Sequence, residues 1–250
     1  MKIIVNSSFL SEKNQILNMI NDFDNTGLTL GNQKRNTIKI FNVNSKKINI
    51  KSFRTPTFFN SLIYNNFRKS KAQRSYEYAN KLISLGIMTP SPIGYAQNSS
   101  LFRLKRSYYV SKHLDYDFTF REVSSDLSFD DSVNILKAFT RFTYKLHEKG
   151  VNFLDHSPGN TLIKKTNNNY DFYLVDLNRM AFIKMTLSSR IKNFSRLSHN
   201  KDIVKIMSSE YAKCIGVSSE VVFELMWEQV KIFRQKVNRK RKFKSLLKIS

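Results

Sequence analysis

The most constraining feature of this sequence is a trio of oxygen-bearing side chains at fixed spacing, Asp155, Asn160 and Asp176. Asp155 and Asn160 lie five residues apart in the turn-rich stretch Leu-Asp-His-Ser-Pro-Gly-Asn, which predicts a loop. Asp176 follows an apolar run, residues 172–175, that is typical of a short buried strand. The pattern therefore favours two polar side chains from one loop and a third at the end of a strand.

The residues around the trio predict a helix, then the loop, then a hairpin. Apolar residues recur at helical intervals over 132–146, so we expect a helix that leads into the loop. Residues 161–163 read as a strand, and the Thr and Asn residues at 166–169 read as the turn before the apolar run. A hairpin returns the chain to its start, so we expect Asp176 to lie beside Asn160.

These residue types suit phosphoryl transfer. A transferring phosphoryl group needs positioning and charge neutralisation more than covalent help, and magnesium prefers hard oxygen ligands. Asp155 can accept the proton of an attacking hydroxyl, while Asn160 and Asp176 can hold the metal. The pattern predicts a phosphotransferase that uses ATP and Mg²⁺, although the Asp-x-x-x-x-Asn spacing alone is also found in ordinary turns.

Such an enzyme also needs a lysine for the nucleotide phosphates and a carboxylate that holds this lysine. Residues 48–51 alternate apolar and polar side chains, which predicts a strand with Lys51 on its polar face. Periodic apolar residues predict a helix over 70–85. That helix carries Glu77, the only acidic residue between Lys51 and Asp115, so we expect Glu77 to pair with Lys51. The alternative is that both are ordinary solvated charges.

Five stretches of the sequence together resemble a known family. They are Ile48-Asn-Ile-Lys51, residues 70–77, Leu146-His-Glu-Lys-Gly-Val151, residues 155–160 and Leu174-Val-Asp-Leu-Asn-Arg179. They are similar to the motifs of the lipopolysaccharide kinase family, the Kdo and heptose kinases, and the resemblance extends over about residues 28–197. It implies an α+β, two-lobed protein-kinase-like fold, in which the N-terminal lobe is an antiparallel sheet plus one main helix and the C-terminal lobe is mostly helical.

The resemblance also implies an activity and roles for single residues. The implied reaction is ATP-dependent phosphorylation of a Kdo or heptose hydroxyl in the inner core of lipopolysaccharide. The implied roles are those of the general base for Asp155, the magnesium ligands for Asn160 and Asp176, and the phosphate-binding lysine with its partner for Lys51 and Glu77.

The sequence departs from the kinase pattern at three places. Phe153 replaces a histidine that is chiefly structural in such kinases, and Leu177-Asn178 replaces the Phe-Gly that follows the metal-binding Asp. The phosphate-covering segment, residues 31–36, has one glycine, so Lys34 or Arg35 or backbone amides are expected to contact phosphate. Two alternatives stay open: a kinase-fold enzyme acting on a protein or another small-molecule hydroxyl, and a non-catalytic kinase-like scaffold that binds anionic surfaces.

Length and the predicted elements favour a single kinase-like domain, residues 1–250. We place the N-terminal lobe at 1–111, the C-terminal lobe at 112–235 and a basic tail at 236–250, with the lobe boundary near 111–117. Strands are expected at 28–30, 36–43, 46–53 and 107–111.

The charge of the chain indicates an anionic partner. Lys and Arg number 42 against 19 Asp and Glu, a formal charge of +23, although an AT-rich genome also encodes excess lysine. An apolar stripe over 221–233 followed by a basic run can lie on an anionic membrane surface, or can pack in the core ahead of a solvated tail. No RNP, KH or zinc pattern is found, so no nucleic acid is expected.

The remaining expectations concern location and assembly. We expect a monomer with a lipopolysaccharide core sugar as acceptor. The chain lacks a signal-peptide pattern and any apolar run of membrane-spanning length, which predicts a cytoplasmic protein, peripheral on the inner face of the cytoplasmic membrane.

Overall fold

The structure, a computed structural model, describes residues 1–31, 36–54, 69–100, 103–167 and 169–246. The chain divides into two compact units. The sheet unit comprises Met1–Asp115 with Asp176–Asn178, and the helical unit comprises Tyr116–Val175 with Arg179–Ser250. The first unit is built on an antiparallel sheet and the second mostly on helices, which is the α+β arrangement that the sequence predicts.

Six strands of the described residues form the sheet of the first unit, in the order β1-β5-β6-β4-β3-β2. All neighbours pair antiparallel. The elements of this unit are β1 Lys2–Val5, the 3-10 turn η1 Ser7–Phe9, α1 Lys13–Asn21, β2 Leu28–Leu30, β3 Asn36–Val43, β4 Lys46–Phe53, α3 Lys71–Ser84, β5 Pro92–Ser100 and β6 Arg103–Lys112. The bounds of β2, β3 and β4 are those expected from the sequence, whereas β1 and β5 were not predicted.

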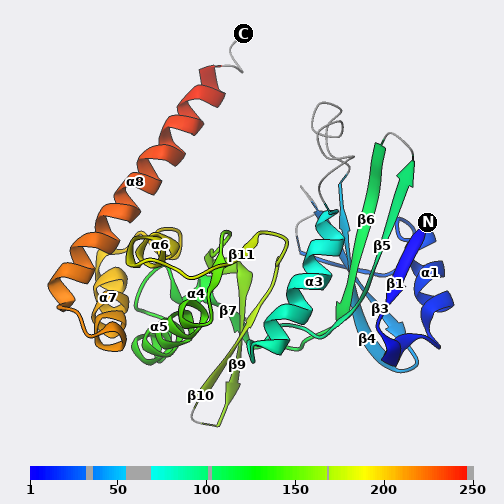
Figure 1. Ribbon diagram of the computed structural model, residues 1–250, viewed down its shortest axis with the longest axis horizontal. Helices are drawn as coiled ribbons and strands as arrows, with labels where there is room; N and C mark the ends of the chain where they lie inside the picture. The colour runs from blue at the N-terminus through cyan, green and yellow to red at the C-terminus, as the bar shows by residue number, and fades with distance from the viewer. Residues whose placement is uncertain (32–35, 55–68, 101–102, 168, 247–250) are drawn as a thin grey trace. The chain divides into compact units, whose positions relative to one another are not determined.

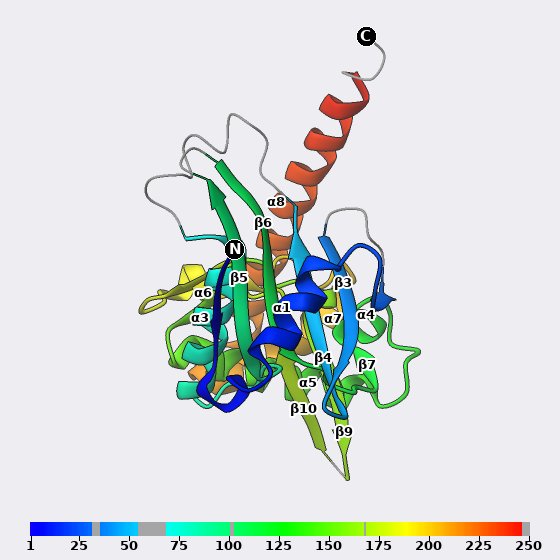
Figure 2. The same cartoon turned by 90° about the vertical axis from the view of Figure 1, so that its right-hand side faces the viewer.

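The helices α1 and α3 cover opposite faces of this sheet (Figure 1, Figure 2). Ile16 of α1 and Ile50 of β4 belong to one core cluster, while Phe53 of β4 and Ala72 of α3 belong to another. Successive strand residues point to opposite faces, so Lys51 shares the α3 face with Phe53. Lys51 therefore lies on the face opposite Ile48 and Ile50, as the period-two pattern of residues 48–51 predicts.

The helical unit packs three helices, α5, α7 and α8, around one core and carries two small sheets. Its elements are β7 Phe118–Thr119, α4 Phe120–Val123, α5 Ser132–Glu148, β8 Val151–Phe153, the 3-10 turn η2 Pro158–Asn160, β9 Thr161–Thr166, β10 Asn169–Leu174, β11 Met180–Phe182, α6 Leu187–Asn193, α7 Lys201–Ile215 and α8 Ser219–Leu246. The predicted helix at 132–146 is α5, and the predicted hairpin is β9 with β10, paired from Thr161 opposite Leu174 to Thr166 opposite Asn169.

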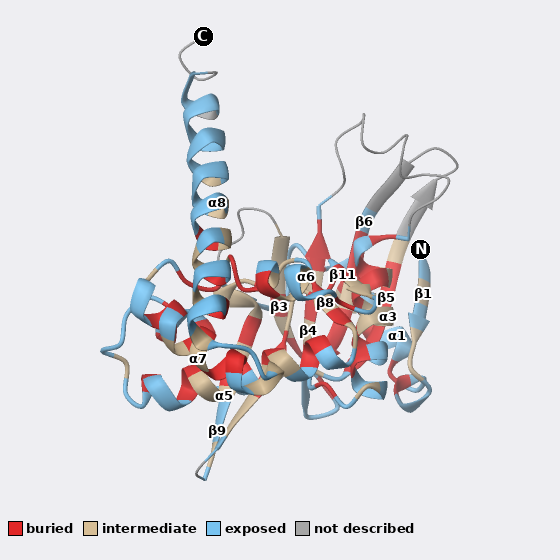
Figure 3. Ribbon diagram, turned by 60° about the vertical axis from the view of Figure 1, so that its left-hand side comes forward, coloured by how far each residue is buried: buried red, intermediate tan, exposed pale blue. Residues whose placement is uncertain are grey.

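Helix α8 is packed along its first half and exposed along its second (Figure 3). Val222, Met226 and Val230 are buried, but Val221 and Leu225 are 50% and 43% exposed, so the predicted apolar stripe is split between two faces. A spacing of four residues keeps only every fourth side chain on the packed face. The basic run that the sequence places in a tail is helical as far as Leu246. None of the helices in the described ranges has the length and apolar character needed to cross a membrane.

Gly150 connects α5 to β8 and leads into the loop of Asp155. Its φ is +68°, and a Cβ atom there would lie 2.9 Å from the carbonyl oxygen of Ile183. Gly216 has nearly the same φ, +67°, but nothing lies within 4 Å of its Cβ position. The two glycines thus separate the cost of the backbone angle from the cost of close packing.

We expect Gly150→Ala to lower the free energy of unfolding by about 2–3 kcal/mol, because it combines left-handed backbone strain with a steric clash. Gly216→Ala carries the strain alone and is expected to cost about 1 kcal/mol. Urea unfolding followed by circular dichroism measures both. Equal losses in the two variants would show that the Ile183 carbonyl does not constrain this turn.

Candidate active site

A two-stranded ladder holds the loop that carries Asp155. Strand β8 pairs with β11, with Phe153 opposite Met180, and the amide of Leu154 donates to the carbonyl of Arg179 at 3.0 Å. Phe153 is fully buried, so the residue that replaces the usual histidine serves as a core side chain. The loop therefore leaves the ladder at a fixed point, immediately before Asp155.

Asp155 is held by two arginines. Its Oδ1 lies 2.5 Å from Nη1 of Arg196, and its Oδ2 lies 3.5 Å from Nη1 of Arg179. The Asp155 side chain is 19% exposed, so it is accessible to a reactant while both of its oxygens face a cation. The carboxylate is thus oriented through both of its oxygens.

Asn160 closes the same loop. Its side-chain Nδ2 donates to the carbonyl oxygen of Asp155 at 2.8 Å, which orients the amide and leaves its Oδ1 as an acceptor. The main-chain oxygen of Asn160 accepts from the amide of Val175 at 3.0 Å. The hairpin thus returns the chain to Asn160 at the residue that directly precedes Asp176, as its spacing predicts.

Asp176 forms an ion pair with Lys51 inside the sheet unit. The distance between Lys51 Nζ and Asp176 Oδ1 is 2.5 Å, and Nδ2 of Asn178 donates to the same oxygen at 2.7 Å. Lys51 is 14% exposed, and its ammonium lies 5.2 Å from the centroid of the Phe53 ring. Two residues that the sequence assigned separately to phosphate and metal, far apart in the chain, therefore meet in one cluster.

The backbone at Asp176 is strained. Its φ is +58°, an angle that residues other than glycine adopt rarely and at a cost of about 1–3 kcal/mol. The bonds to Lys51 and Asn178 hold this conformation, and the following Leu177 is buried. Asn178, which stands where protein kinases have a glycine, thus bonds directly to the Asp176 carboxylate.

The expected pair of Lys51 with Glu77 is wrong. Among the described residues, Glu77 pairs with Lys69, whose Nζ lies 2.9 and 2.8 Å from its two carboxylate oxygens, and it accepts from Nε2 of Gln73 at 3.0 Å. The ammonium of Lys51 is bonded to Asp176 instead. Glu77 was expected because it is the only acidic residue between Lys51 and Asp115, whereas the fold supplies a carboxylate from much later in the chain.

Lys34 and Arg35, expected to contact phosphate, lie outside the described residues. The oxygen donors expected for magnesium are chemically suitable, because Asp176 offers a carboxylate and Asn160 an amide oxygen. Within the described ranges no three His, Cys, Asp or Glu residues gather to hold a metal. Magnesium held by two side chains and the substrate phosphates needs no such cluster.

Two buried histidines support the Asp155 loop through one amide. Oδ1 of Asn193 lies 3.2 Å from Nε2 of His147 and 2.9 Å from Nδ1 of His156, and its Nδ2 donates to the carbonyl of Phe153 at 2.9 Å. The Asn193 oxygen can only accept, so both rings donate to it, and Nδ1 of His147 accepts from the hydroxyl of Tyr211 at 2.7 Å. This assignment leaves Nδ1 of His147 without a proton, so the His147 ring is neutral.

Burial first of all lowers the pKa of both rings, to about 4 for His147 and about 3 for His156. The positive charge of Arg190 on His147 and of Arg196 on His156 adds to this effect, while the hydrogen bond to Asn193 opposes it. The unfolded chain, with histidine pKa values near 6.5, binds more protons below that pH than the folded chain does. The contribution of the two histidines to the free energy of unfolding is therefore fully present above pH 6.5 and is lost as the pH falls toward 4.

We expect the free energy of unfolding to be about 3 kcal/mol lower at pH 5 than at pH 7, since each histidine contributes up to about 1.4 kcal/mol per pH unit. Urea unfolding at the two pH values measures this difference. An unfolding free energy that is equal at pH 5 and pH 7 would contradict the neutral assignment.

Sequence reasoning missed Arg196 and Asn193. Neither belongs to a spaced motif, and both act through contacts with the Asp155 loop some 40 residues earlier in the chain. Only the path of the segment after α6 brings them to the loop, and no local pattern records that path.

Comparison with known proteins places these features in a family context. The family model described as the lipopolysaccharide kinase (Kdo/WaaP) family matches residues 26–214. A solved structure, "WaaP in complex with acyl carrier protein", is similar with a TM-score of 0.63 at 14% identity, covering 96% of this chain and 99% of that chain. At this identity the likeness shows the fold, and it confirms the kinase-like fold expected from the sequence. No curated protein sequence matches the chain.

Proposed function

The chain belongs to the lipopolysaccharide kinase (Kdo/WaaP) family. We propose that it transfers phosphate from a magnesium-bound ATP to a Kdo or heptose hydroxyl, and that Asp155, Asn160 and Asp176 form the site of transfer. Family membership makes the chain a phosphotransferase that acts on a core sugar of lipopolysaccharide. The nucleotide, the metal, the attacked sugar and the role of each residue belong to the proposal.

Each residue has a separate task in this reaction. Asp155 takes the proton of the attacking hydroxyl, and Asn160 and Asp176 would hold magnesium by their side-chain oxygens. A magnesium ion held there would neutralise charge on the nucleotide phosphates. Lys51, which is paired with Asp176 at 2.5 Å, supplies a cation for the phosphates close to the carboxylate that holds the metal.

The contact between Lys51 and Asp176 is the observation that carries the proposal. A nearly buried lysine is paired there with a carboxylate held at a strained φ of +58°. Strain of this kind is concentrated at functional sites. The pair therefore favours a working nucleotide site over a kinase-like scaffold.

A protein acceptor has less support than a sugar. After Asp176, strand β11 ends at Phe182 and α6 begins at Leu187, so only residues 183–186 separate them. This stretch is too short for the extended activation loop on which protein kinases dock peptides.

We further propose that the enzyme meets its acceptor at the inner face of the cytoplasmic membrane. The second half of α8 exposes five basic residues in a row of seven, Lys236, Arg239, Lys240, Arg241 and Lys242. Each such cation near an anionic lipid surface contributes about 1 kcal/mol of attraction. The solved WaaP structure contains acyl carrier protein, so co-purification of that protein with this chain is worth testing in the same preparation.

The direct test incubates the purified chain with γ-labelled ATP, Mg²⁺ and lipopolysaccharide isolated from cells that lack the gene. We expect label in the inner-core fraction after mild acid hydrolysis, and none when Mg²⁺ is chelated. If label enters added protein but not the core sugars, the acceptor is a protein and not a sugar. Absence of any transfer, with ATP bound, would favour the scaffold.

A further inference from the structure

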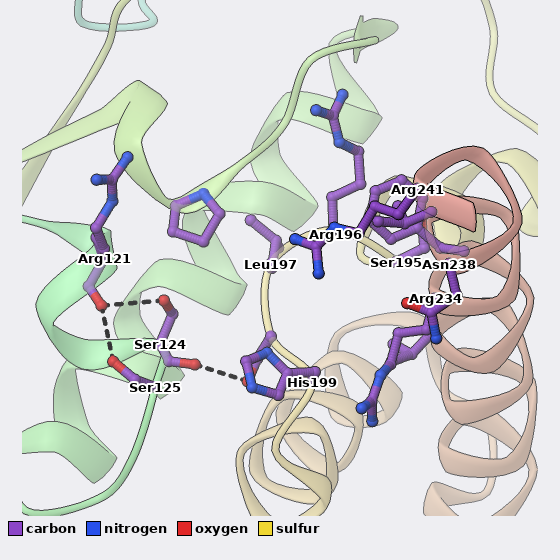
Figure 4. A pocket seen from close by; sticks show the side chains of 15 residues that line it. Arg121, Ser124, Ser125, Ser195, Arg196, Leu197, His199, Arg234, Asn238 and Arg241 are labelled. Atoms are coloured by element: carbon purple, nitrogen blue, oxygen red, sulfur yellow. Dashed lines mark hydrogen bonds between the residues drawn. The ribbon is translucent and has the colours of Figure 1, made fainter. Parts of the chain in front are cut away.

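A cavity of about 450 Å³ opens in the helical unit next to the Asp155 loop. Figure 4 shows Arg121 of α4 with Ser124 and Ser125 on one side of it and residues of α8 on the other, with Leu197 and His199 between them. Pro158, from the 3-10 turn that follows Asp155, also lines the cavity. Its size lies in the range of small-molecule sites.

The lining is basic and polar. Four guanidinium groups contribute to it, from Arg121, Arg196, Arg234 and Arg241, together with His199. The lining residues include no Asp or Glu. Across the described part of the chain, only Arg196 among these four arginines has a carboxylate within ion-pair distance. Arginine forks match carboxylate and phosphate oxygens, so the cavity is suited to an anionic group.

Two of the arginines connect the cavity to the catalytic loop. Arg196 joins Asp155 at 2.5 Å, and its guanidinium carbon lies 5.6 Å from the centroid of the Phe233 ring on α8. Nη2 of Arg121 lies 2.5 Å from the position that a Cβ atom would take at Gly159. Glycine at this position therefore allows a guanidinium to lie against the loop between Asp155 and Asn160.

We propose that this cavity binds the acid groups of the acceptor, carboxylate or phosphate, and so positions the acceptor hydroxyl at Asp155. The inference rests on the proposed function, since it takes Asp155 to be the base. Nucleotide phosphate is assigned elsewhere, to Lys51 and Asp176 of the sheet unit. Arg121, Arg234 and Arg241 select the acceptor by its charge, and Arg196 links the bound acid group to the base.

The kinetic test replaces two of the arginines on α8 that do not touch Asp155. In Arg234→Gln/Arg241→Gln we expect the KM for lipopolysaccharide to rise about tenfold, while kcat and the KM for ATP stay within about twofold. The matched control is Lys164→Gln/Lys205→Gln, which removes the same charge from β9 and α7 of the same unit, outside the lining and outside the basic run of α8. Equal effects of the two double variants on the KM for acceptor would overturn the proposal, because only general surface charge would then matter.

A binding test without turnover uses pyrophosphate as the probe. We expect pyrophosphate to raise the melting temperature of the wild type more than chloride of matched ionic strength does, and the Arg234→Gln/Arg241→Gln variant to lose this difference. The control double variant should keep it. A pyrophosphate effect that is the same in all three proteins would exclude the cavity as an anion site, even if core sugars are phosphorylated.

The two tests separate failure of this inference from failure of the proposed function. If pyrophosphate binds in the cavity but no core sugar is phosphorylated, the assignment to an acceptor falls together with the proposed function.

Acceptor whose phosphates have been removed enzymatically identifies the acid group that is bound. A raised KM in the wild type with this acceptor indicates phosphate, and an unchanged KM indicates carboxylate. Anionic vesicles without acceptor test for a lipid site. If they compete with acceptor for the wild type and this competition is lost in Arg234→Gln/Arg241→Gln, the arginines bind the lipid surface instead.

Discussion

Asp155→Asn lowers kcat for core phosphorylation by about 10²–10⁴-fold, the usual contribution of a general base, with little change in ATP binding. Asparagine has nearly the shape of aspartate but cannot take up the proton of the attacking hydroxyl. The Asn160 side chain bonds to the main-chain oxygen of residue 155, so the substitution leaves that contact in place. The rate of label transfer from γ-labelled ATP, at saturating acceptor, measures the effect.

The control for this variant is Asp171→Asn, which makes the same change on strand β10, away from the loop. It should leave kcat within about twofold, since surface substitutions are mostly small in effect. Asp155→Asn should also keep a folded circular dichroism spectrum. A kcat within about threefold of the wild type would remove Asp155 from the role of base.

Asp176→Asn is expected to lower activity by at least about a hundredfold through loss of magnesium-dependent ATP binding. The substitution removes a charged metal ligand and leaves the nearly buried ammonium of Lys51 without its partner. ATP with Mg²⁺ should raise the melting temperature of the wild type, and ATP with a chelator should not. In Asp176→Asn the two conditions should give the same melting temperature.

Asp24→Asn provides the matched control in the same unit. Asp24 also forms an ion pair, with Arg106 at 2.6 Å, but its side chain is 68% exposed. Breaking an exposed pair costs little, so the magnesium-dependent shift should persist in this variant. If Asp176→Asn kept a normal shift, the metal would have to be held by other residues.

Local sequence pattern accounts for much of the fold and for the core of the site. Alternation in residues 48–51 placed Lys51 on the face opposite Ile48 and Ile50, and the turn-rich residues 166–169 gave the hairpin that returns the chain to Asn160. These elements depend on neighbours in the chain, so their signals are short-range. Strands β1 and β5 were missed because four residues in β1 and a Ser- and Asn-rich end in β5 give weak patterns.

The partners within the site could not be derived from sequence in the same way. Lys51 contacts a carboxylate 125 residues later, and Glu77 is satisfied by the nearby Lys69. Arg196 and Asn193 reach the Asp155 loop only through the path of the chain after α6. Ion pairs and buried amides are chosen by three-dimensional proximity, which residue spacing does not specify. The sequence thus identified the reactive groups better than the groups that hold them.

Mass spectrometry of inner-core oligosaccharide from three strains shows whether Asp155 is the base of a core-sugar phosphotransfer. These are a strain with the intact gene, a strain without it, and a strain without it that expresses Asp155→Asn at a matched protein level. We predict a core phosphate in the first strain and its loss from the other two. The same phosphate content in all three strains would exclude Asp155 as the base of such a reaction.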